Sequence, residues 1–587
     1  MMKFPSQSDE ARRALADMRS GVRGVAVLSF MIALFPVMMT LYLLLVFDVA
    51  LPGHSIQTLI GITVIFLLLT ATNGFFRLLR SRMLGHMGDI IATHFTPRLD
   101  EATARMGETS ALNTSSGMQI SRDIDAIQYF IKSPAAAAWL DIAALPILLL
   151  TMIFLHGWLA LTLLIFAAGM LYLLMRAIQL SEQPIRDAVP LLARRHSISE
   201  AGHSYPDVVR ALGMRSRAVR AWTLVNTALL RIGNTAREVD RRAILIAEGA
   251  RMAALTVFLV VGGSLAIADM ASPAVVFTAA LLGWMAVSPI VQAVEYASHF
   301  VAARQSWTRL DTVLHSVQPS PPTLQLPVPK GTLACEGVAV LVPGGKRPAV
   351  QGLSFTLNAG DVLAILGPAG CGKSVALRGI AGAWPLAAGK VRLDGAALDQ
   401  WDPELLGAHV GYMPQTIDLL DGTVAENIAR FDPNAEAKTV VEAAKSALAH
   451  DIIVRLADGY NMRVGPNGRR LSLSQAQRIG LARALYGDPF LIALDEPASQ
   501  LDLAGGQQFA DAVAGARKRG AIVVLAGTSS HVIDVATHVL MMRDGMMVDF
   551  GPKDDVRKRL AAKRTASEIN AAPPKSRSKP AKAEANI

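Results

Sequence analysis

Three long stretches of this chain contain no lysine or arginine, and they constrain its fold more than any other feature. They run from Gly24 to Phe76, from Ser133 to Met175 and from Met252 to Ala303. Each stretch is long enough for two helices of about 20 residues, the length that crosses a bilayer. Each therefore predicts a hairpin of two membrane-spanning helices, and the sequence predicts six spans in all.

Polar or helix-breaking residues interrupt each stretch where a hairpin needs a turn. The predicted breaks lie at Asp48–Ser55, at His156–Gly157 and at Asp269–Ser272. The composition agrees with a chain that lies partly in a membrane, because 52% of the residues are apolar and only 18% are charged. The first apolar run begins near Val25 without a small-residue cleavage site, so we expect it to be retained.

Basic residues crowd the segments between the apolar stretches. They precede the first span and follow the second and the fourth: Arg12, Arg13, Arg19, Arg23, Arg77, Arg80, Arg82, Arg176 and Arg186. The positive-inside rule then places both termini in the cytosol and the three short turns outside. The net charge of +10 reflects this topology. No nucleic-acid partner is predicted, because the cations are not interleaved with aromatic residues on one compact domain.

Two basic connectors, Arg77–Lys132 and Arg176–Arg251, are too long for simple loops and have helical patterning. We interpret them as cytosolic extensions of the membrane helices. The alternative, two amphipathic surface domains, is disfavoured because the connectors lack glycine and proline punctuation. Asp141 and Glu295 lie near the inner ends of the third and sixth spans, where we expect them to reach water; the alternative is a role in a transport pathway.

A proline-rich segment, Ser316–Lys330, contains five prolines and predicts a linker to a second domain. The tail from Ala561 to Ile587 has six basic and two acidic residues and three prolines, which predicts disorder. It is expected to be solvated; the alternative is contact with anionic lipid. The two cysteines, Cys335 and Cys371, are too few for a disulfide framework and favour a reducing compartment.

The second domain contains a phosphate-binding loop. The apolar stretch Val362–Leu366 predicts a strand, and the G-x-x-x-x-G-K-[ST] motif follows it. The predicted ATP-binding residues are Gly367, Pro368, Ala369, Gly370, Cys371, Gly372, Lys373, Ser374 and Val375. Glycines allow backbone N–H groups to surround phosphates, Lys373 neutralises their charge, and the Ser374 hydroxyl ligates Mg²⁺.

Two carboxylates follow a second apolar run, Phe490–Leu494. Asp495 is predicted to hold Mg²⁺ through water, and Glu496 to polarise the water that attacks the γ-phosphate. The alternative is a solvated acidic turn, which five preceding apolar residues disfavour.

With these motifs the sequence resembles the ABC transporter family over nearly its whole length. Gly411–Gln415 resembles the Q-loop, so the resemblance assigns Gln415 to Mg²⁺ and the γ-phosphate; Ser499 to Asp502 resembles the D-loop. Several further segments are similar to permease/ATPase subunits of type I secretion systems: Phe47–Pro52, Trp401–Asp402, Asp421–Ile428 and Ala482–Pro489.

The resemblance implies a membrane all-α six-helix ABC exporter domain plus an α/β P-loop ABC ATPase domain. It implies ATP and Mg²⁺ as cofactors and a homodimer or a heterodimer with another half-transporter. The implied partners are a membrane-fusion protein, an outer-membrane channel, a polypeptide cargo and membrane lipid, at the inner membrane of a Gram-negative bacterium. Five parts are predicted: an N-terminal cytosolic segment, a six-span domain, a linker, a nucleotide-binding domain and a basic tail, at residues 1–20, 21–315, 316–330, 331–560 and 561–587.

The sequence departs from the family at three places. The signature L-S-G-G-Q corresponds to Leu471, Ser472, Leu473, Ser474 and Gln475. Glycine permits close approach to the partner's γ-phosphate, so the Cβ atoms at Leu473 and Ser474 are expected to hinder it. Thr528 stands at the switch-histidine position; His531, three residues on, is expected to be a surface residue, or else a substitute in a rebuilt loop. No aromatic residue for adenine stacking lies between residues 337 and 348.

These departures leave alternatives to ATP-driven protein export. One is a weakly or non-hydrolysing half of a heterodimeric exporter, and the other is an exporter of lipid or small molecules.

Overall fold

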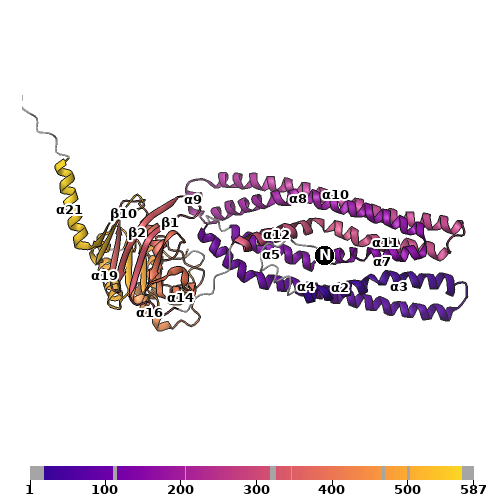
Figure 1. The fold of residues 1–587 in the computed structure, drawn as a ribbon, viewed down its shortest axis with the longest axis horizontal. Helices are drawn as coiled ribbons and strands as arrows, with labels where there is room; N and C mark the ends of the chain where they lie inside the picture. The colour runs from indigo at the N-terminus through magenta and orange to yellow at the C-terminus, as the bar shows by residue number, and fades with distance from the viewer. Residues whose placement is uncertain are drawn as a thin grey trace, which may run out of the picture. The chain divides into compact units, whose positions relative to one another are not determined.

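The computed structural model describes residues 19–109, 115–204, 206–316, 326–345, 347–465, 468, 470–498 and 503–570. The chain divides into two compact units, one comprising most of residues 1–318 and the other residues 319–587. The first unit is helical and the second contains a sheet (Figure 1).

The helical unit consists mainly of long helices, and α8 and α10 lie side by side along their length (Figure 1). Its elements are α2 (Arg19–Ala33), α3 (Phe35–Leu44), the π-helical turn η1 (Leu45–Ala50), α4 (Ile56–Thr109), α5 (Ser115–Lys132), α6 (Pro134–Ile142), α7 (Leu145–Leu155), α8 (Gly157–Ser204), α9 (Pro206–Ala211), α10 (Arg215–Ile267), α11 (Pro273–Glu295) and α12 (Ala297–Ser316).

Within the described residues, five helices are long and apolar enough to cross a membrane, and six if the bent pair α6 and α7 forms one span. The six predicted spans correspond to these helices when the bent pair is counted. The helices end at all three predicted breaks. The turns of the first and third hairpins touch, because Ser272 Oγ donates a hydrogen bond of 3.0 Å to Asp48 Oδ2.

The third span contains a break that the sequence analysis did not predict. Helices α6 and α7 meet at an angle of 46° across Ala143 and Ala144. Pro146 lies in the first turn of α7. It has no N–H to donate to the carbonyl of Ile142, and its ring clashes with the preceding turn, so a straight helix cannot pass this point.

The basic connectors are helical and largely continuous with the spans. Helix α4 has 54 residues, α8 has 48 and α10 has 53, so each runs from an apolar stretch into a connector. These helices are longer than a bilayer requires, because at 1.5 Å per residue about 20 residues cross the hydrocarbon core. The remaining residues of each helix extend beyond the core.

Asp141 differs from its prediction. The side chain was expected to be solvated, but it is about four-fifths buried and forms an ion pair with Arg80, whose guanidinium also donates to Ser29 Oγ. Arg80 comes from α4, Asp141 from α6 and Ser29 from α2, so one buried cation joins three helices. Two charges leave water at acceptable cost only when paired and hydrogen-bonded. Glu295 is exposed, as expected.

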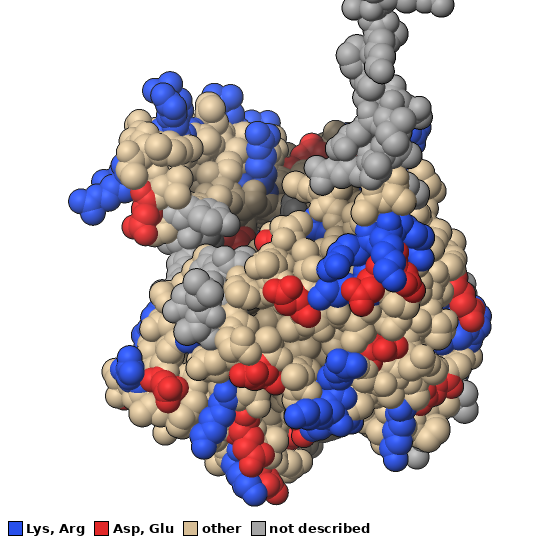
Figure 2. Space-filling view, turned by 90° about the vertical axis from the view of Figure 1, so that its left-hand side faces the viewer, with Lys and Arg blue, Asp and Glu red and all other residues tan. Residues whose placement is uncertain are grey.

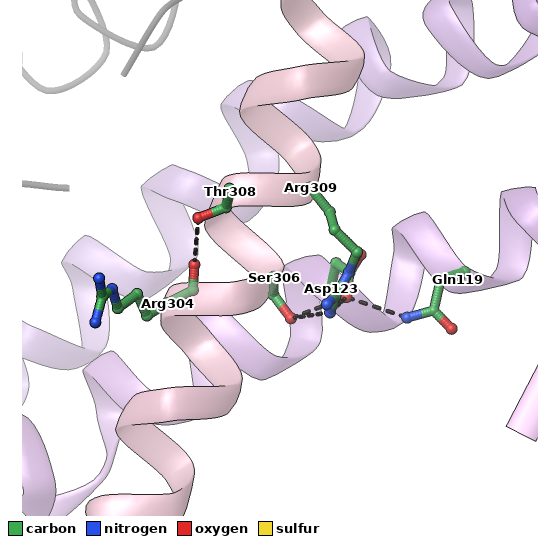
Figure 3. Close-up of polar contacts among 6 residues, drawn as sticks. All are labelled: Gln119, Asp123, Arg304, Ser306, Thr308 and Arg309. Carbon is green, nitrogen blue, oxygen red and sulfur yellow. Dashed lines mark hydrogen bonds and ion pairs between the residues drawn. The ribbon is translucent and has the colours of Figure 1, made fainter. Parts of the chain in front are cut away.

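A second buried carboxylate joins α5 to α12 (Figure 3). Asp123 Oδ1 accepts hydrogen bonds from Ser306 Oγ at 2.8 Å and Arg309 Nη2 at 2.5 Å, and Asp123 Oδ2 accepts from Arg309 Nε at 3.0 Å. Gln119 donates to the same carboxylate. Arg304, one turn away on α12, points away from this group (Figure 3).

The sheet-containing unit holds one ten-stranded sheet, in the order β5-β4-β1-β2-β10-β9-β3-β8-β7-β6. The strands are β1 (Thr332–Leu341), β2 (Pro348–Asn358), β3 (Val362–Leu366), β4 (Leu386–Leu393), β5 (Ala396–Ala397), β6 (Val410–Met413), β7 (Leu491–Asp495), β8 (Ile522–Ala526), β9 (His538–Arg543) and β10 (Met546–Pro552). β3 pairs in parallel with β8 and β9, and β7 pairs in parallel with β6 and β8.

The remaining elements of this unit are helical. They are α13 (Lys373–Ile380), η2 (Leu398–Gln400), α14 (Pro403–His409), α15 (Val424–Ile428), α16 (Ala437–Ser446), α17 (His450–Val454), η3 (Gly459–Asn461), α18 (Leu473–Leu485), α19 (Leu503–Lys518), α20 (Ser530–Val535) and α21 (Lys553–Asn570).

Both faces of the central strands are buried. Alternate residues of β7 belong to two separate cores: Leu491 and Ala493 to one, Ile492 and Leu494 to the other. This follows from the two-residue period of a strand. Strands buried on both faces read as continuous apolar runs, which is why β3, β7 and β8 look alike in the sequence.

Helix α21 extends ten residues into the tail that was predicted to be disordered from Ala561 onward. The reason is local: Asp554 and Asp555 favour the N-terminus of the helix, and alanine, arginine and lysine continue it with high helix propensity. The predicted tail beyond Asn570 and most of the predicted segment 1–20 and linker lie outside the described residues.

Over most of the face drawn in Figure 2, acidic and basic side chains are interspersed.

Candidate functional site

Four of the five adjacent parallel strands carry candidate site residues where they end, at one edge of the sheet. They are β3, β8, β7 and β6, which are neighbours in that order. Parallel strands place their carboxyl ends together, and in open α/β sheets ligands bind at that edge. Asp495 is the last residue of β7, and four further residues lie within two positions of a strand end, namely Glu496, Gln415, Gly527 and Thr528.

The phosphate-binding loop connects β3 to α13. Gly372, the residue before α13, has a φ of 99°, which disfavours any residue with a side chain. A Cβ there would lie 2.8 Å from Cγ2 of Val350. Lys373 Nζ donates to the carbonyls of Gly367 and Pro368, each at 3.0 Å. The loop therefore holds its lysine at the N-terminus of a helix, where anions are favoured.

Asp495 lies at the end of β7 with only 1% of its surface exposed. Its Oδ2 atom is buried without a hydrogen-bond partner. Burial raises the pKa of this carboxyl, and the neighbouring Ser374 hydroxyl partly opposes the shift. An orphaned carboxylate oxygen beside a serine hydroxyl suits a hard cation such as Mg²⁺, which prefers oxygen ligands. The residues present thus fit the metal that the family implies.

Glu496 follows directly in a left-handed conformation, with φ 49°. Its backbone N–H donates to the Ala526 carbonyl at 2.8 Å, which fixes it against β8. Gln415 Nε2 donates to Glu496 Oε2 at 3.1 Å. The structure therefore brings together the two predicted catalytic side chains, which lie 81 positions apart in the sequence. The left-handed backbone of Glu496 is a strained conformation of the kind that gathers at functional sites.

The signature segment forms the start of α18. Ser472 caps this helix: its Oγ accepts from the Gln475 N–H at 3.2 Å, and the Gln475 side chain accepts from the Ser472 N–H at 2.8 Å. This is a capping box. Leu473 and Ser474 lie in the first helical turn without left-handed backbone, and Leu473 is 62% exposed. The absence of the two glycines therefore causes no backbone strain within this chain. The side chains of Leu473 and Ser474 can hinder only a group that approaches the signature segment from outside, such as a nucleotide bound to a partner subunit.

Thr528 is exposed just after β8. His531 lies in α20 and is half-buried, which differs from the free surface position expected. Its imidazole packs against Gly506 of α19, where a Cβ would come within 2.4 Å of the ring. The glycine makes room for the ring, a contact that local sequence does not reveal.

Two predicted residues, Ser499 and Asp502, lie outside the described part of the chain. One contact was missed: Gln477 Nε2 donates to the backbone carbonyl of Glu496 at 3.4 Å. Its position two residues after the signature glutamine was the available signal.

A bundle of apolar helices joined to a phosphate-loop sheet domain with a capped signature helix defines an ABC exporter half-transporter. Residues 350–499 match the family model described as ABC transporter. A solved bacterial Atm1-family ABC exporter with ATP bound has the same fold, with a TM-score of 0.73 and 21% identity over 95% of this chain and 99% of that one.

The chain is also 36% identical over 543 residues to the type I secretion system ATP-binding protein PrsD of Rhizobium meliloti (strain 1021), covering 92% of this chain and 93% of the relative. An ATP-dependent lipid A-core flippase of Chromobacterium violaceum is 30% identical over 280 residues, 47% of each chain. The chain therefore belongs to the ABC transporter superfamily, among the type I secretion permease/ATPases. It is a multi-pass membrane protein and an ATP-binding ABC ATPase whose hydrolysis is coupled to transport.

Proposed function

We propose that this protein exports a polypeptide across the inner membrane of a Gram-negative bacterium, as the dimeric permease/ATPase of a type I secretion system. The observation that supports this most is the extent of the similarity to PrsD, which includes the helical unit as well as the ATPase. Similarity over only part of the chain would leave the substrate undetermined, because the lipid A-core flippase also matches 47% of this chain. The positive-inside pattern supports a cytoplasmic ATPase and cytoplasmic termini.

Each candidate side chain at the carboxyl edge of the parallel strands has a role in the proposed ATP hydrolysis. Lys373 neutralises charge on the β- and γ-phosphates, and Gln415 orients the attacking water beside Glu496, which accepts its proton. Ser374, Asp495 and Gln415 would hold Mg²⁺, which would supply charge neutralisation at the phosphate oxygens. In the dimer, Ser472 of one subunit completes the site of the other.

A periplasmic adaptor and an outer-membrane channel complete the proposed route of the polypeptide. The first experiment deletes the gene in its host and compares the secreted proteins with those of a strain that carries Glu496→Gln. Loss of one or a few secreted proteins in both strains supports the proposal. Unchanged secretion, together with altered lipid export, favours the lipid exporter instead.

The degenerate signature and Thr528 favour a second candidate, a weakly hydrolysing half of a heterodimer. Purification in mild detergent tests it, with the ATPase measured beside Glu496→Gln. An active homodimer that loses about 100-fold or more of its rate in the variant excludes that candidate, whereas a second co-purifying half-transporter supports it.

A further inference from the structure

Arg430 is a half-buried cation that bonds only to backbone carbonyls among the described residues. It follows α15 in a left-handed conformation, with φ 56°, and Phe431 after it has φ 59°. Arg430 Nε donates to the Arg483 carbonyl at 3.0 Å, one Nη to the carbonyls of Gly407 and Val410, and the other Nη to Ala484. A guanidinium is suited to this task because it offers five donors in a fixed plane.

The four acceptors belong to three elements, α14, β6 and α18, and the last two lead to the ATP site. Gly407 and Val410 lie at the end of α14 and the start of β6, the strand that precedes Gln415. Arg483 and Ala484 lie in the last turn of α18, the helix that the signature residue Ser472 caps. Carbonyls in the last turn of a helix have no partners within it and attract cations.

A missing side chain brings β6 and α18 into direct contact at this point. A Cβ on Gly411 would lie only 2.0 Å from the carbonyl oxygen of Ala484. The backbone of the strand thus rests on the end of the helix, and Arg430 bonds to both sides of the contact.

A second guanidinium extends the connection beyond Gln415. Arg483 Nη1 donates to the carbonyl of Asp418 at 2.9 Å. The Gln415 segment is therefore held before the glutamine by Arg430 and after it by Arg483, and α18 participates in both contacts.

We propose that Arg430 and Arg483 are positioning residues that make the Gln415 segment and the signature helix α18 move as one body. A helix of 13 residues is a rigid rod about 20 Å long. Displacement of Gln415 at one ATP site is thereby transmitted to Ser472 at the far end of α18. This inference rests on the proposed dimer, in which that serine serves the opposite site, and it links the two sites through named contacts.

The test uses the full-length chain in detergent with Arg430→Lys and Arg483→Lys. Lysine retains the charge but cannot reach several carbonyls at once. The matched control is Arg517→Lys, because Arg517 also donates to a carbonyl, that of Gly360, from the separate helix α19. We expect at least a tenfold fall in kcat for the two variants, an ATP Kd within twofold of wild type, and no change in the control.

Combination with Gln415→Ala separates positioning from stability. If Arg430 acts through Gln415, the double variant is no slower than Gln415→Ala alone. Multiplied losses, or a fall in kcat that merely follows a lower unfolding temperature, would overturn the proposal.

A readout without hydrolysis distinguishes failure of this proposal from failure of the proposed function. Spin labels are placed at Leu420→Cys and Leu473→Cys, which are 63% and 62% exposed, while the native Cys335 and Cys371 are buried. Labelled chains are diluted with unlabelled chain so that only the distance between the two labels of one chain is measured. We expect one narrow distribution of this distance, both with and without ATP, and a broader distribution in Arg430→Lys. An unchanged distribution in the variant would overturn the proposal even if the protein exports nothing.

Discussion

The residues proposed to carry the chemistry lie at the edge of the sheet, and the buried carboxylate of Asp495 shows the effect of that position on stability. Burial raises the pKa of its carboxyl above the ordinary value of 3.8. The folded state therefore binds the proton more tightly than the unfolded state, and the ionised form destabilises the fold at neutral pH. Stability from this group increases as the pH falls through the folded-state pKa towards 3.8, and is lost as the pH rises again.

Asp495→Asn should stabilise the nucleotide-free chain at pH 7 and abolish ATP hydrolysis. Removing a buried charge with an orphaned oxygen is worth about 1 kcal/mol, or about 3 °C in unfolding temperature for a domain of this size. Thermal unfolding without nucleotide measures it, with Asp544→Asn as the control because that side chain is 86% exposed. Equal shifts in the unfolding temperatures of Asp495→Asn and Asp544→Asn would contradict the view that the buried charge of Asp495 destabilises the fold.

The signature substitutions give a second prediction at this scale. Leu473 and Ser474 cause no strain within the chain, so restoring both glycines relieves only the approach to the partner's phosphate. We expect the ATPase rate to rise about tenfold, equivalent to ~1.4 kcal/mol. Some stability is lost, because glycine disfavours the helix by up to about 1 kcal/mol per residue. An unchanged rate would mean that the loop already functions as it stands.

At the scale of elements, the contact between α5 and α12 combines an apolar cluster with one buried carboxylate. Asp123 has a side chain only 4% exposed, whereas its partner Arg309 is 35% exposed. Removing the arginine leaves a buried charge uncompensated, but removing the carboxylate leaves a cation that reaches water. The two single substitutions should therefore differ in cost.

We expect Arg309→Met to destabilise the helical unit by about 3 kcal/mol and Asp123→Asn by less. The double variant should be more stable than Arg309→Met. Resistance to limited proteolysis in detergent ranks the stabilities of these variants. Arg304→Met, on the same helix, serves as the control. A double variant weaker than both single variants would show that the pair is not the relevant contact.

Elements with a local signal were predictable from the sequence, and contacts between distant elements were not. The hairpin breaks and the phosphate loop follow from short patterns of apolar, cationic and glycine residues. The pairing of Arg80 with Asp141 and that of Gln415 with Glu496 join residues 61 and 81 positions apart. No periodicity marks such pairs, because they arise only when packed elements bring them together. The bend between α6 and α7 did have a local signal, Pro146, but this proline lies within a continuous apolar stretch that was interpreted as one straight span.

At the scale of the whole molecule, the proposed dimer makes each ATP site from two subunits. A genetically linked dimer tests this directly. Lys373→Ala in one half and Ser472→Ala in the other damage the same composite site and leave the second intact, so about half of the ATPase activity should remain. Both substitutions in one half damage both sites and should abolish it. Equal activity of the two linked dimers would contradict shared sites.

The alignment of the four strand ends has a wider consequence for how such a transporter evolves. The central strands of the ATPase are buried on both faces and tolerate little change, but exposed positions outside the sheet, such as Leu473 and Thr528, are free of that packing constraint. We expect substitutions there to change how long a nucleotide stays bound before it is cleaved more than they change the stability of the fold. The duration of each cycle is thus a property that selection can set separately from the stability of the fold.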